Sequence, residues 1–435
     1  MKPIGVIVSD HTLRSKIAGL LGTEGGAHYS LEYLENPQAA QDYLQYGMPE
    51  IVIMNFSDTG LDAHSILTQM AQDPFLHAFG IVGLFDRAAH DEKELLQRLA
   101  PVNLVNLIEI GMLPGNLSKT LNIVEANRQI VFQRDLSNRF FGRVAGIFEI
   151  DNDLNAVSCY SNLLVICLSN SGYVDDARKI GLTVALNELI LNGIEHGNCR
   201  ITYEEKSEFL RDNPDIGDLI ALRCRDPEIA CRKVRLEYTI THTQARFVIS
   251  DEGKGFNPRV QHNPLDRENL TRVHGRGIYM ARHFVDSLEY NDAGTSATLV
   301  MRYAKDMTRF IPRGFRDQEE VFVKPGEVVF REGERSDFLY YVVSGSLLVT
   351  HHESEVGRVT PGDLFVGEMS FLLNNRRSAT VVAETESKLV KISKEAFVTA
   401  IRKYPHYGIF LSRLLAEKLV KANAMISERA AAKML

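Results

Sequence analysis

Three polar residues of the kinds found in catalytic sites recur every four positions in the apolar segment LNELILNGIEHGN, residues 186–198. Residues four apart on a helix lie one above another, so Glu188, Asn192 and His196 would share one face. A solvated face is the ordinary explanation for such a row on a helix. Two glycine-rich segments further along the chain favour a binding site instead.

These two segments have the composition of a nucleotide pocket. The strand-like run ARFVISDEGKGF ends in a turn that contains Asp251, Gly253 and Gly255. The second segment, HGRGIYMARHFVD, opens an amphipathic helix with Gly275 and Gly277. Glycines let backbone N–H groups approach a phosphate, and a helix N-terminus favours an anion. An aspartate at a strand end can accept a hydrogen bond from an exocyclic amine.

The order of these motifs resembles that of a known ATPase superfamily. A helix with E-x-x-x-N, then D-x-G-x-G, then a helix opened by G-x-G is shared by histidine kinases, gyrase-type topoisomerases, Hsp90-like chaperones and mismatch-repair proteins. Within this superfamily, the segment from about Phe148 to Tyr303 is similar to the anti-sigma-factor serine kinases, through IGLTVALNEL and GRGIYMARHFVDSLEY. The resemblance implies an α+β two-layer sandwich over residues 146–305 that binds ATP.

The same resemblance implies roles for individual residues. The family residue matched by Glu188 is the general base, and the one matched by Asn192 holds Mg²⁺ against the ATP phosphates. The aspartate matched by Asp251 binds the adenine amino group, and the four glycines shape the pocket. Thr298, in the strand SATLV, matches a threonine or serine near adenine. For His196, a phosphate contact and a structural place at the helix end both stay open.

Two features of the middle segment depart from the simplest family pattern. A polar insert between Gly197 and Val234 is longer than a minimal serine kinase needs. It predicts either solvated helices or a partner-binding element. No helix with a phosphoacceptor-type H-E sequence precedes the ATPase segment, which argues against a histidine autokinase.

Residues 1–117 alternate apolar strand-like runs with amphipathic segments, as in IGVIVSD, EIVIMNF, GIVGLF and LVNLIEI. This alternation predicts a doubly wound α/β sheet with buried parallel strands. The segment PEIVIMNFSDTGLDA resembles the third strand and following loop of response-regulator receivers, with Gly60 and Asp62 in register.

The receiver chemistry is missing at four positions. The phosphoacceptor aspartate falls on Asn55, whose amide cannot form an acyl phosphate, and the first-strand acidic pair is reduced to Ser9 and Asp10. The hydroxyl switch falls on Phe85, and no lysine occurs between positions 93 and 119. The resemblance therefore predicts a pseudo-receiver that serves in dimerisation or docking.

The segment that follows, residues 118–145, has a helical pattern and predicts a linker. Its apolar positions predict either the seam of a homodimer or packing onto the chain's own domains. These positions are Leu121, Val124, Ile130, Val131, Leu136 and Phe140.

Residues 306–435 show short strands separated by glycines and a final helix-like segment, which predict a small β-barrel with a C-terminal helix. The stretch FVGEMSFLLNNRRSATVVA resembles the phosphate-binding cassette of cyclic-nucleotide-binding domains, whose fold is a jelly roll. In that family G-E-[LM], here Gly367, Glu368 and Met369, precedes R-[AST]-A, here Arg377 and Ser378. Glu368 suits the ribose 2′-OH, and Arg377 suits the cyclic phosphate through its planar fork.

The ligand at this cassette is predicted to be cAMP or cGMP, with cAMP favoured, and an unliganded barrel is the alternative. A ligand-facing Arg377 would not belong to the core, so its loss should spare the fold. No helix-turn-helix follows, which argues against a transcription factor of the cAMP-receptor type.

Composition limits the remaining classes. The chain has 435 residues, 45% hydrophobic and 24% charged, which is ordinary for a soluble protein of several domains. A net charge of −7 gives no support for a nucleic-acid surface. Its 5 cysteines have no metal-ligand spacing, and no apolar run approaches the about 20 residues of a membrane span. A cytoplasmic protein without a signal peptide is expected.

Two hypotheses for the whole chain follow. In the first, cyclic nucleotide regulates an ATP-dependent serine protein kinase whose partner is an anti-sigma-factor antagonist or a sigma-factor-like protein. In the second, the chain is a non-catalytic ATP-binding switch that captures or releases such a partner under cyclic nucleotide control. Glu188 favours the first, because a binding module needs no base there.

Overall fold

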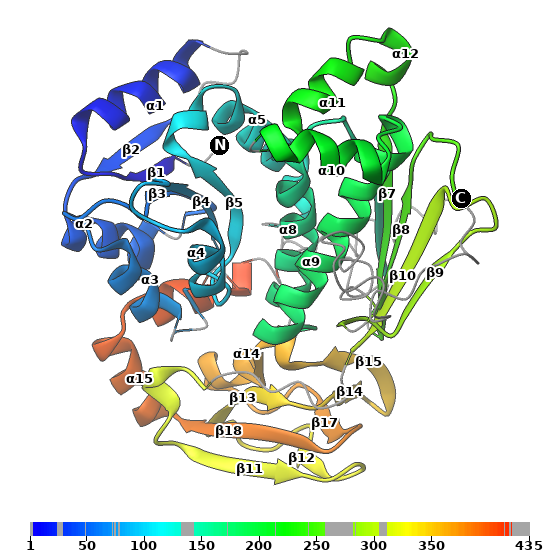
Figure 1. Cartoon of the computed structure of the whole chain (residues 1–435). Helices are drawn as coiled ribbons and strands as arrows, with labels where there is room; N and C mark the ends of the chain where they lie inside the picture. The colour runs from blue at the N-terminus through cyan, green and yellow to red at the C-terminus, as the bar shows by residue number, and fades with distance from the viewer. Residues whose placement is uncertain are drawn as a thin grey trace, which may run out of the picture.

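The computed structural model divides into three units that pack against one another (Figure 1). It describes residues 3–23, 29–47, 49–71, 73, 75–76, 79–131, 143–171, 173–213, 215–241, 243–256, 282, 284–303, 311–412, 414–416 and 419. No helix in these ranges is both long and apolar enough to cross a membrane.

The N-terminal unit is built on a parallel sheet in the order β2-β1-β3-β4-β5. Its three central strands, β1, β3 and β4, are buried along their whole length, as expected when helices cover both faces. They are β1 (Ile4–Ile7), β2 (Leu31–Leu34), β3 (Ile51–Asn55), β4 (Gly80–Phe85) and β5 (Leu104–Glu109). This strand order is that of the flavodoxin-like doubly wound fold. The specific relation to receivers stays a prediction.

The helices of this unit follow the strands in sequence. They are α1 (His11–Thr23), α2 (Pro37–Asp42), the turn η1 (Tyr43–Gly47), α3 (Ala63–Ala71), α4 (Glu92–Arg98), the turn η2 (Ile110–Met112), α5 (Leu113–Ala126) and α6 (Arg128–Val131). Leu121 and Val124, two positions of the possible dimer seam, are buried in the core that α1 and α5 form over the sheet. The predicted linker over 118–145 therefore differs from the structure. Its first residues complete α5, and its last begin a strand.

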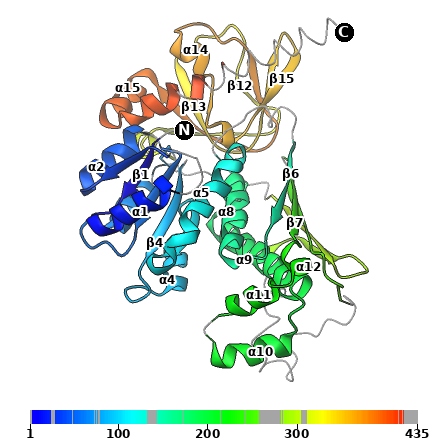
Figure 2. The ribbon, with the colours of Figure 1, turned by 90° about the horizontal axis from the view of Figure 1, so that it is seen from above.

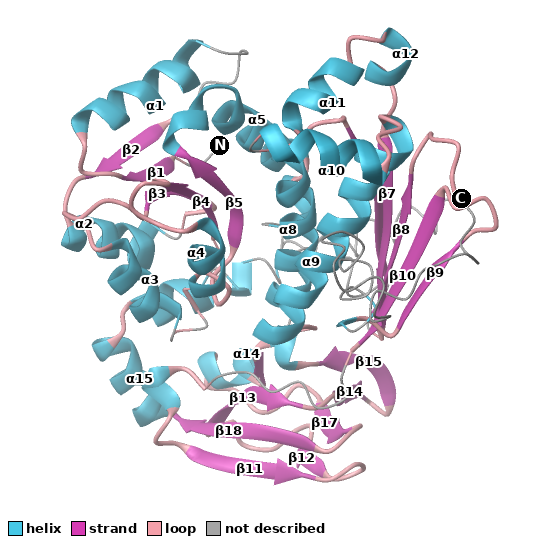
Figure 3. Cartoon of the chain, in the orientation of Figure 1, coloured by secondary structure: helices cyan, strands magenta, loops and turns pink. Residues whose placement is uncertain are grey.

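The middle unit is an antiparallel sheet in the order β6-β7-β8-β10-β9 (Figure 3). Its strands are β6 (Arg143–Ile150), β7 (Val234–Thr241), β8 (Gln244–Ser250), β9 (Ser287–Tyr290) and β10 (Ser296–Arg302). Helices α8 (Leu154–Asn170) and α9 (Asp176–Asn192) pack on one face. Each helix begins at an aspartate, Asp153 or Asp175, whose carboxylate accepts a backbone N–H of the first turn. The two-layer α+β sandwich is confirmed.

The insert after α9 forms three short helices, α10 (Tyr203–Asp212), α11 (Gly217–Arg223) and α12 (Pro227–Ala230), that follow the turn η3 (Gly193–Asn198). It is not wholly solvated decoration, because Ile216, Leu219, Ile220 and Ile229 are buried in the core of the middle unit.

Helix α8 belongs to two cores at once. Figure 2 shows it between the N-terminal sheet and the strands β6 and β7. One face of α8 shares a core with Val6, Val82 and Val105 of the N-terminal strands, through Ala156, Cys159, Leu163 and Ile166. The other face, with Val157, Leu164, Val165 and Leu168, packs in the core of the middle unit.

The C-terminal unit consists of two four-stranded sheets, β11-β18-β13-β16 and β12-β17-β14-β15, which form a jelly-roll sandwich rather than one closed barrel. Its strands are β11 (Glu319–Val323), β12 (Val328–Phe330), β13 (Phe338–Ser344), β14 (Leu347–His351), β15 (Ser354–Val359), β16 (Phe365–Val366), β17 (Thr380–Ala383) and β18 (Ser387–Ser393). Its helices are η5 (Arg313–Phe315), η6 (Pro361–Asp363), α14 (Glu368–Leu372) and α15 (Lys394–Lys403).

The N-terminal unit inserts one aromatic side chain into the core of the C-terminal unit. Phe75, from the segment between α3 and β4, is 3% exposed there. Its ring lies 4.6–6.5 Å, centroid to centroid, from the rings of Phe315, Tyr341, Phe365, Tyr407 and Phe410. Beside it, the buried Asp73 carboxylate and His406 Nε2 are 3.0 Å apart. The two units therefore share part of one core.

Candidate functional sites

The row of polar residues lies on α9 and its continuation, as predicted. Glu188 and Asn192 are half-buried on α9, and His196 follows in η3. The Nδ1 atom of His196 is 2.6 Å from the carbonyl oxygen of Ile201, and its ring lies 4.2 Å from that of Tyr203. These contacts give His196 a structural place at the helix end, while a phosphate contact stays a prediction.

The turn after β8 is built against the end of this helix. A Cβ added to Gly197 would lie 2.3 Å from Asp251 Cγ, and one added to Gly253 would lie 2.5 Å from the Gly197 carbonyl oxygen. Gly255 has φ +71°, and its Cβ would lie 1.9 Å from the carbonyl oxygen of Ala293. Only glycines therefore permit this close approach. The structure brings Asp251 and Gly253 to the end of the row on α9, as the motif order predicted, whereas Gly255 packs against Ala293 in the loop before β10.

The Asp251 carboxylate is partly buried and accepts a backbone hydrogen bond in the turn after β8. Its Oδ1 accepts a hydrogen bond from the Gly253 N–H at 2.8 Å. Burial raises the pKa of Asp251, while the Gly253 N–H opposes that shift. Tyr290 lies close by, and burial raises the pKa of its hydroxyl to about 12. A partly desolvated carboxylate suits an exocyclic amine as its donor.

Thr298 does not join this pocket. It pairs with Val248 in the middle of β10, and its neighbours Ala297 and Leu299 point into the core on the helix side. Successive strand residues point to opposite faces, so Thr298 lies on the far face of the sheet. The threonine beside the aspartate is Thr295, whose carbonyl oxygen accepts the Asp251 N–H at 3.1 Å.

Gly275 and Gly277 lie outside the described residues, so the helix that these glycines are expected to open stays a prediction.

The sequence motifs missed two charged residues beside Glu188, one in η3 and one in the insert. Glu195, 3% exposed, is ion-paired with Lys206 of α10. Burial raises the pKa of Glu188. The Lys206 ammonium opposes this shift, and the Glu195 carboxylate adds to it. Glu195 follows Asn192 by three residues, and that helical spacing was the available signal; nothing in the local sequence pointed to Lys206.

Asn198 is a second residue that the motifs missed. It is fully buried, its Oδ1 accepts the Glu252 N–H at 2.9 Å, and its Nδ2 donates to Asn152 Oδ1 at 2.9 Å. This carboxamide therefore fixes the turn after β8 to the end of the row on α9.

In the C-terminal unit, the predicted cassette folds around Arg377. Gly367 adopts φ +82°, and a Cβ there would lie 2.3 Å from Arg377 Nη1. Glu368 is buried at the start of α14, and Met369 is exposed. Ser378 is exposed beside them. The five predicted residues are thus brought together.

Arg377 is more buried than a purely ligand-facing residue would be. It is 4% exposed and lies over the Phe330 ring, with its Cζ 4.1 Å from the ring centroid. Nη1 donates to the Gly367 carbonyl oxygen at 3.0 Å, and Nη2 donates to the Phe338 carbonyl oxygen. The expectation that Arg377 lies outside the core is therefore wrong.

One atom of Arg377 still lacks a partner. Its Nε is buried and makes no hydrogen bond to the described residues. A buried donor without an acceptor costs about 1–3 kcal/mol, and an anionic oxygen would remove that cost. The cassette therefore fits a cyclic phosphate.

The N-terminal unit has no comparable chemistry at its strand ends. Asn55 is buried at the end of β3, and its Oδ1 accepts the Ser57 N–H at 3.0 Å. Ser9 donates both its N–H and its hydroxyl to Asp58. Phe85 is 1% exposed at the end of β4. At the two positions that the predicted receiver register assigns to the phosphoacceptor and the hydroxyl switch, the structure therefore has an amide and a phenyl ring.

Comparison with known proteins identifies two of the units. The cyclic nucleotide-binding domain family matches residues 320–404, and the histidine kinase-like ATPase domain family matches residues 162–303. The cyclic AMP receptor protein of Thermus thermophilus is 36% identical over 22% of this chain and 47% of its own length. A lysophospholipase of Neurospora crassa is 27% identical over 28% of this chain and 8% of its own length.

Among solved structures, the catabolite activator protein of Thermus thermophilus is 27% identical with a TM-score of 0.25. That similarity covers 27% of this chain and 57% of that one. The chain thus spans less than half the length of the two curated relatives named above. The chain therefore carries a cyclic nucleotide-binding domain and a histidine kinase-like ATPase domain.

Proposed function

We propose that the chain is an ATP-dependent serine protein kinase of the anti-sigma type whose activity is set by cyclic nucleotide. The observation that carries the kinase part is Glu188. Its carboxylate lies one turn before Asn192, and burial raises its pKa, which makes it a better proton acceptor near neutral pH. A module that only binds ATP needs no proton acceptor there.

Asn192 also fits a Mg²⁺-bound nucleotide. Amide oxygens are among the ligands that Mg²⁺ takes, and Asn192 is half-buried at the end of α9. When bound, Mg-ATP supplies the phosphoryl group and neutralises charge that develops on it. Asn192 would hold the ion, Asp251 would accept the adenine amine, and Glu188 would take the proton of the substrate hydroxyl. The substrate proposed is a serine of a small anti-sigma-factor antagonist.

The route from the cyclic nucleotide to the ATPase unit is proposed to run through the N-terminal unit. Phe75 stacks against Phe365, which lies two residues before Gly367 of the cassette. On its other side, the N-terminal unit packs on α8, and Lys179 of α9 donates to the Val102 carbonyl oxygen. A shift of the cassette would reach α9 through these packed elements.

One observation favours the second candidate, a non-catalytic ATP-dependent switch. Tyr203 and Lys206 of the insert lie beside Glu188, since each interacts electrostatically with a carboxylate of this group. They flank the position that a substrate hydroxyl must reach. If they exclude the substrate, the nucleotide would control only the capture of a partner.

Phosphate transfer from radiolabelled ATP to a co-purified partner, with and without cAMP or cGMP, separates the two candidates. Glu188→Gln should lower transfer by about 10²-fold or more and leave ATP affinity unchanged. Glu204→Gln, at an exposed carboxylate in the first turn of α10, is the matched control and should behave as wild type. Equal transfer by Glu188→Gln and wild type refutes the kinase. Nucleotide-dependent capture without any transfer supports the switch.

A further inference from the structure

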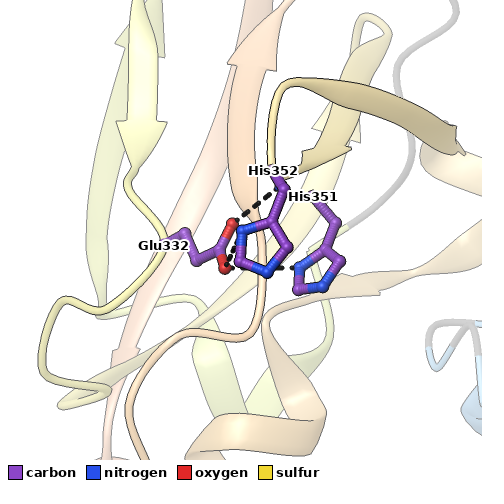
Figure 4. A group of neighbouring side chains, drawn as sticks. All are labelled: Glu332, His351 and His352. Atoms are coloured by element: carbon purple, nitrogen blue, oxygen red, sulfur yellow. Dashed lines mark hydrogen bonds and ion pairs between the residues drawn. The ribbon is translucent and has the colours of Figure 1, made fainter.

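A carboxylate and two imidazoles converge at the hairpin between β14 and β15, and none of the three belongs to the predicted nucleotide sites (Figure 4). Glu332 follows β12, His351 ends β14, and His352 lies in the turn. Their ligand atoms lie within 4.8 Å of one another. The Nδ1 atoms of His351 and His352 are 3.4 Å and 3.3 Å from Glu332 Oε1.

The turn itself brings the two rings to one side. Adjacent strand residues normally point to opposite faces. Here His352 and Glu353 have φ +46° and +64°, so the chain reverses and the second ring faces Glu332 as well. The His352 N–H donates to Glu332 Oε2 at 3.1 Å, which orients the carboxylate toward the rings.

We propose that Glu332, His351 and His352 bind a divalent transition-metal ion of the zinc type. Imidazole and carboxylate donors suit zinc and its neighbours, whereas Mg²⁺ and Ca²⁺ take oxygen ligands. Two ligands of a tetrahedral zinc ion, at about 2.0–2.2 Å each, lie about 3.3–3.6 Å apart, a range that includes the observed N–O separations. The His352 side chain is 77% exposed, so a water can complete the coordination.

The proposed ion would act on the cyclic nucleotide site, an effect that goes beyond the proposed kinase function. His351 Nδ1 is 2.9 Å from the carbonyl oxygen of Ser378, the residue after Arg377. The Glu332 N–H donates to Thr380 Oγ1 at 3.0 Å. A ring nitrogen cannot both donate a proton and bind a metal, so the ion would replace the His351 contact to Ser378. Metal and cyclic nucleotide would therefore alter each other's affinity by the same factor.

The test titrates the full chain with zinc chloride by calorimetry, as wild type, as the His351→Ala/His352→Ala double variant and as Glu332→Gln. His11→Ala, which removes an exposed imidazole at the start of α1, is the control. Wild type and control should bind one more zinc equivalent than the double variant, or bind it at least about tenfold more tightly. Glu332→Gln keeps the side-chain size, so weaker binding there is not a folding defect.

Unchanged zinc stoichiometry and affinity in both site variants would overturn the proposal, as would a wild type that binds no zinc. Cyclic nucleotide affinity is the second readout. Zinc should change it in wild type and in His11→Ala but not in the double variant. An equal change in all of these proteins would overturn the link to the cassette.

Discussion

Replacement of Phe75 by alanine should disconnect the cyclic nucleotide site from the rest of the chain. The side chain is 3% exposed and touches five aromatic rings of the C-terminal unit. Truncation of a phenylalanine buried this deeply costs about 3–5 kcal/mol. The coupling free energy between two sites is typically about 1–3 kcal/mol. The packing free energy lost in Phe75→Ala is therefore larger than the coupling free energy that this contact would carry.

The assay compares ATP turnover, or partner binding, with and without saturating cyclic nucleotide. In wild type the ratio should be about 5-fold or more, and in Phe75→Ala it should fall close to one. Phe79→Ala is the matched control, because Phe79 is 7% exposed in the same segment and, among the described residues, belongs to the N-terminal core. It should lower stability and preserve the ratio. A Phe75→Ala protein with the wild-type ratio, or a Phe79→Ala protein that loses it equally, would refute the reasoning.

Three further outcomes are expected. Asn192→Ala should weaken Mg-ATP binding, measured by calorimetry, and equal affinity in both proteins would contradict its role as ligand. Arg377→Ala should lower cyclic nucleotide affinity by about 2 kcal/mol or more. Because the guanidinium is buried, this variant should also unfold at a lower urea concentration. Wild-type affinity in the variant would contradict the assignment of Arg377 to the cyclic phosphate. Burial lowers the pKa of Lys179 from 10.5 to about 8, so the unfolded chain binds more protons above pH 8, and this residue's contribution to stability should rise with pH. The difference in unfolding free energy between wild type and Lys179→Met should therefore shift in favour of wild type by on the order of 2 kcal/mol from pH 8 to pH 10, and a constant difference would contradict the lowered pKa.

The site on α9 was predictable where it depends on local spacing. Glu188 and Asn192 share a helical face because residues four apart do so, and the glycines of the turn after β8 are required by close backbone contact. The expectation that Thr298 lies near the adenine site differs from the structure, and the reason is again local. Side chains alternate along a strand, so Thr298 faces away from the helices because its neighbours Ala297 and Leu299 face them.

Contacts between units could not be predicted from such patterns. The sequence around Phe75 shows no periodicity that distinguishes it from a core residue of its own domain. Its side chain nevertheless packs against residues that lie more than two hundred positions further along the chain. Arg377 presents a similar case. Its motif predicts the ligand, but its burial depends on Phe330 and Phe338, which come from other strands. These features depend on tertiary packing, which the local patterns of a single sequence do not reveal.

The double packing of α8 has a consequence for how the protein can be divided. A fragment that ends before Leu154 would expose the apolar side of the N-terminal sheet that Ala156, Cys159, Leu163 and Ile166 cover. Such a patch favours aggregation. Conversely, a fragment that begins at α8 would carry the same four side chains into water. The N-terminal and middle units should therefore lose structure together in one cooperative transition, and proteolysis should release neither as a stable piece.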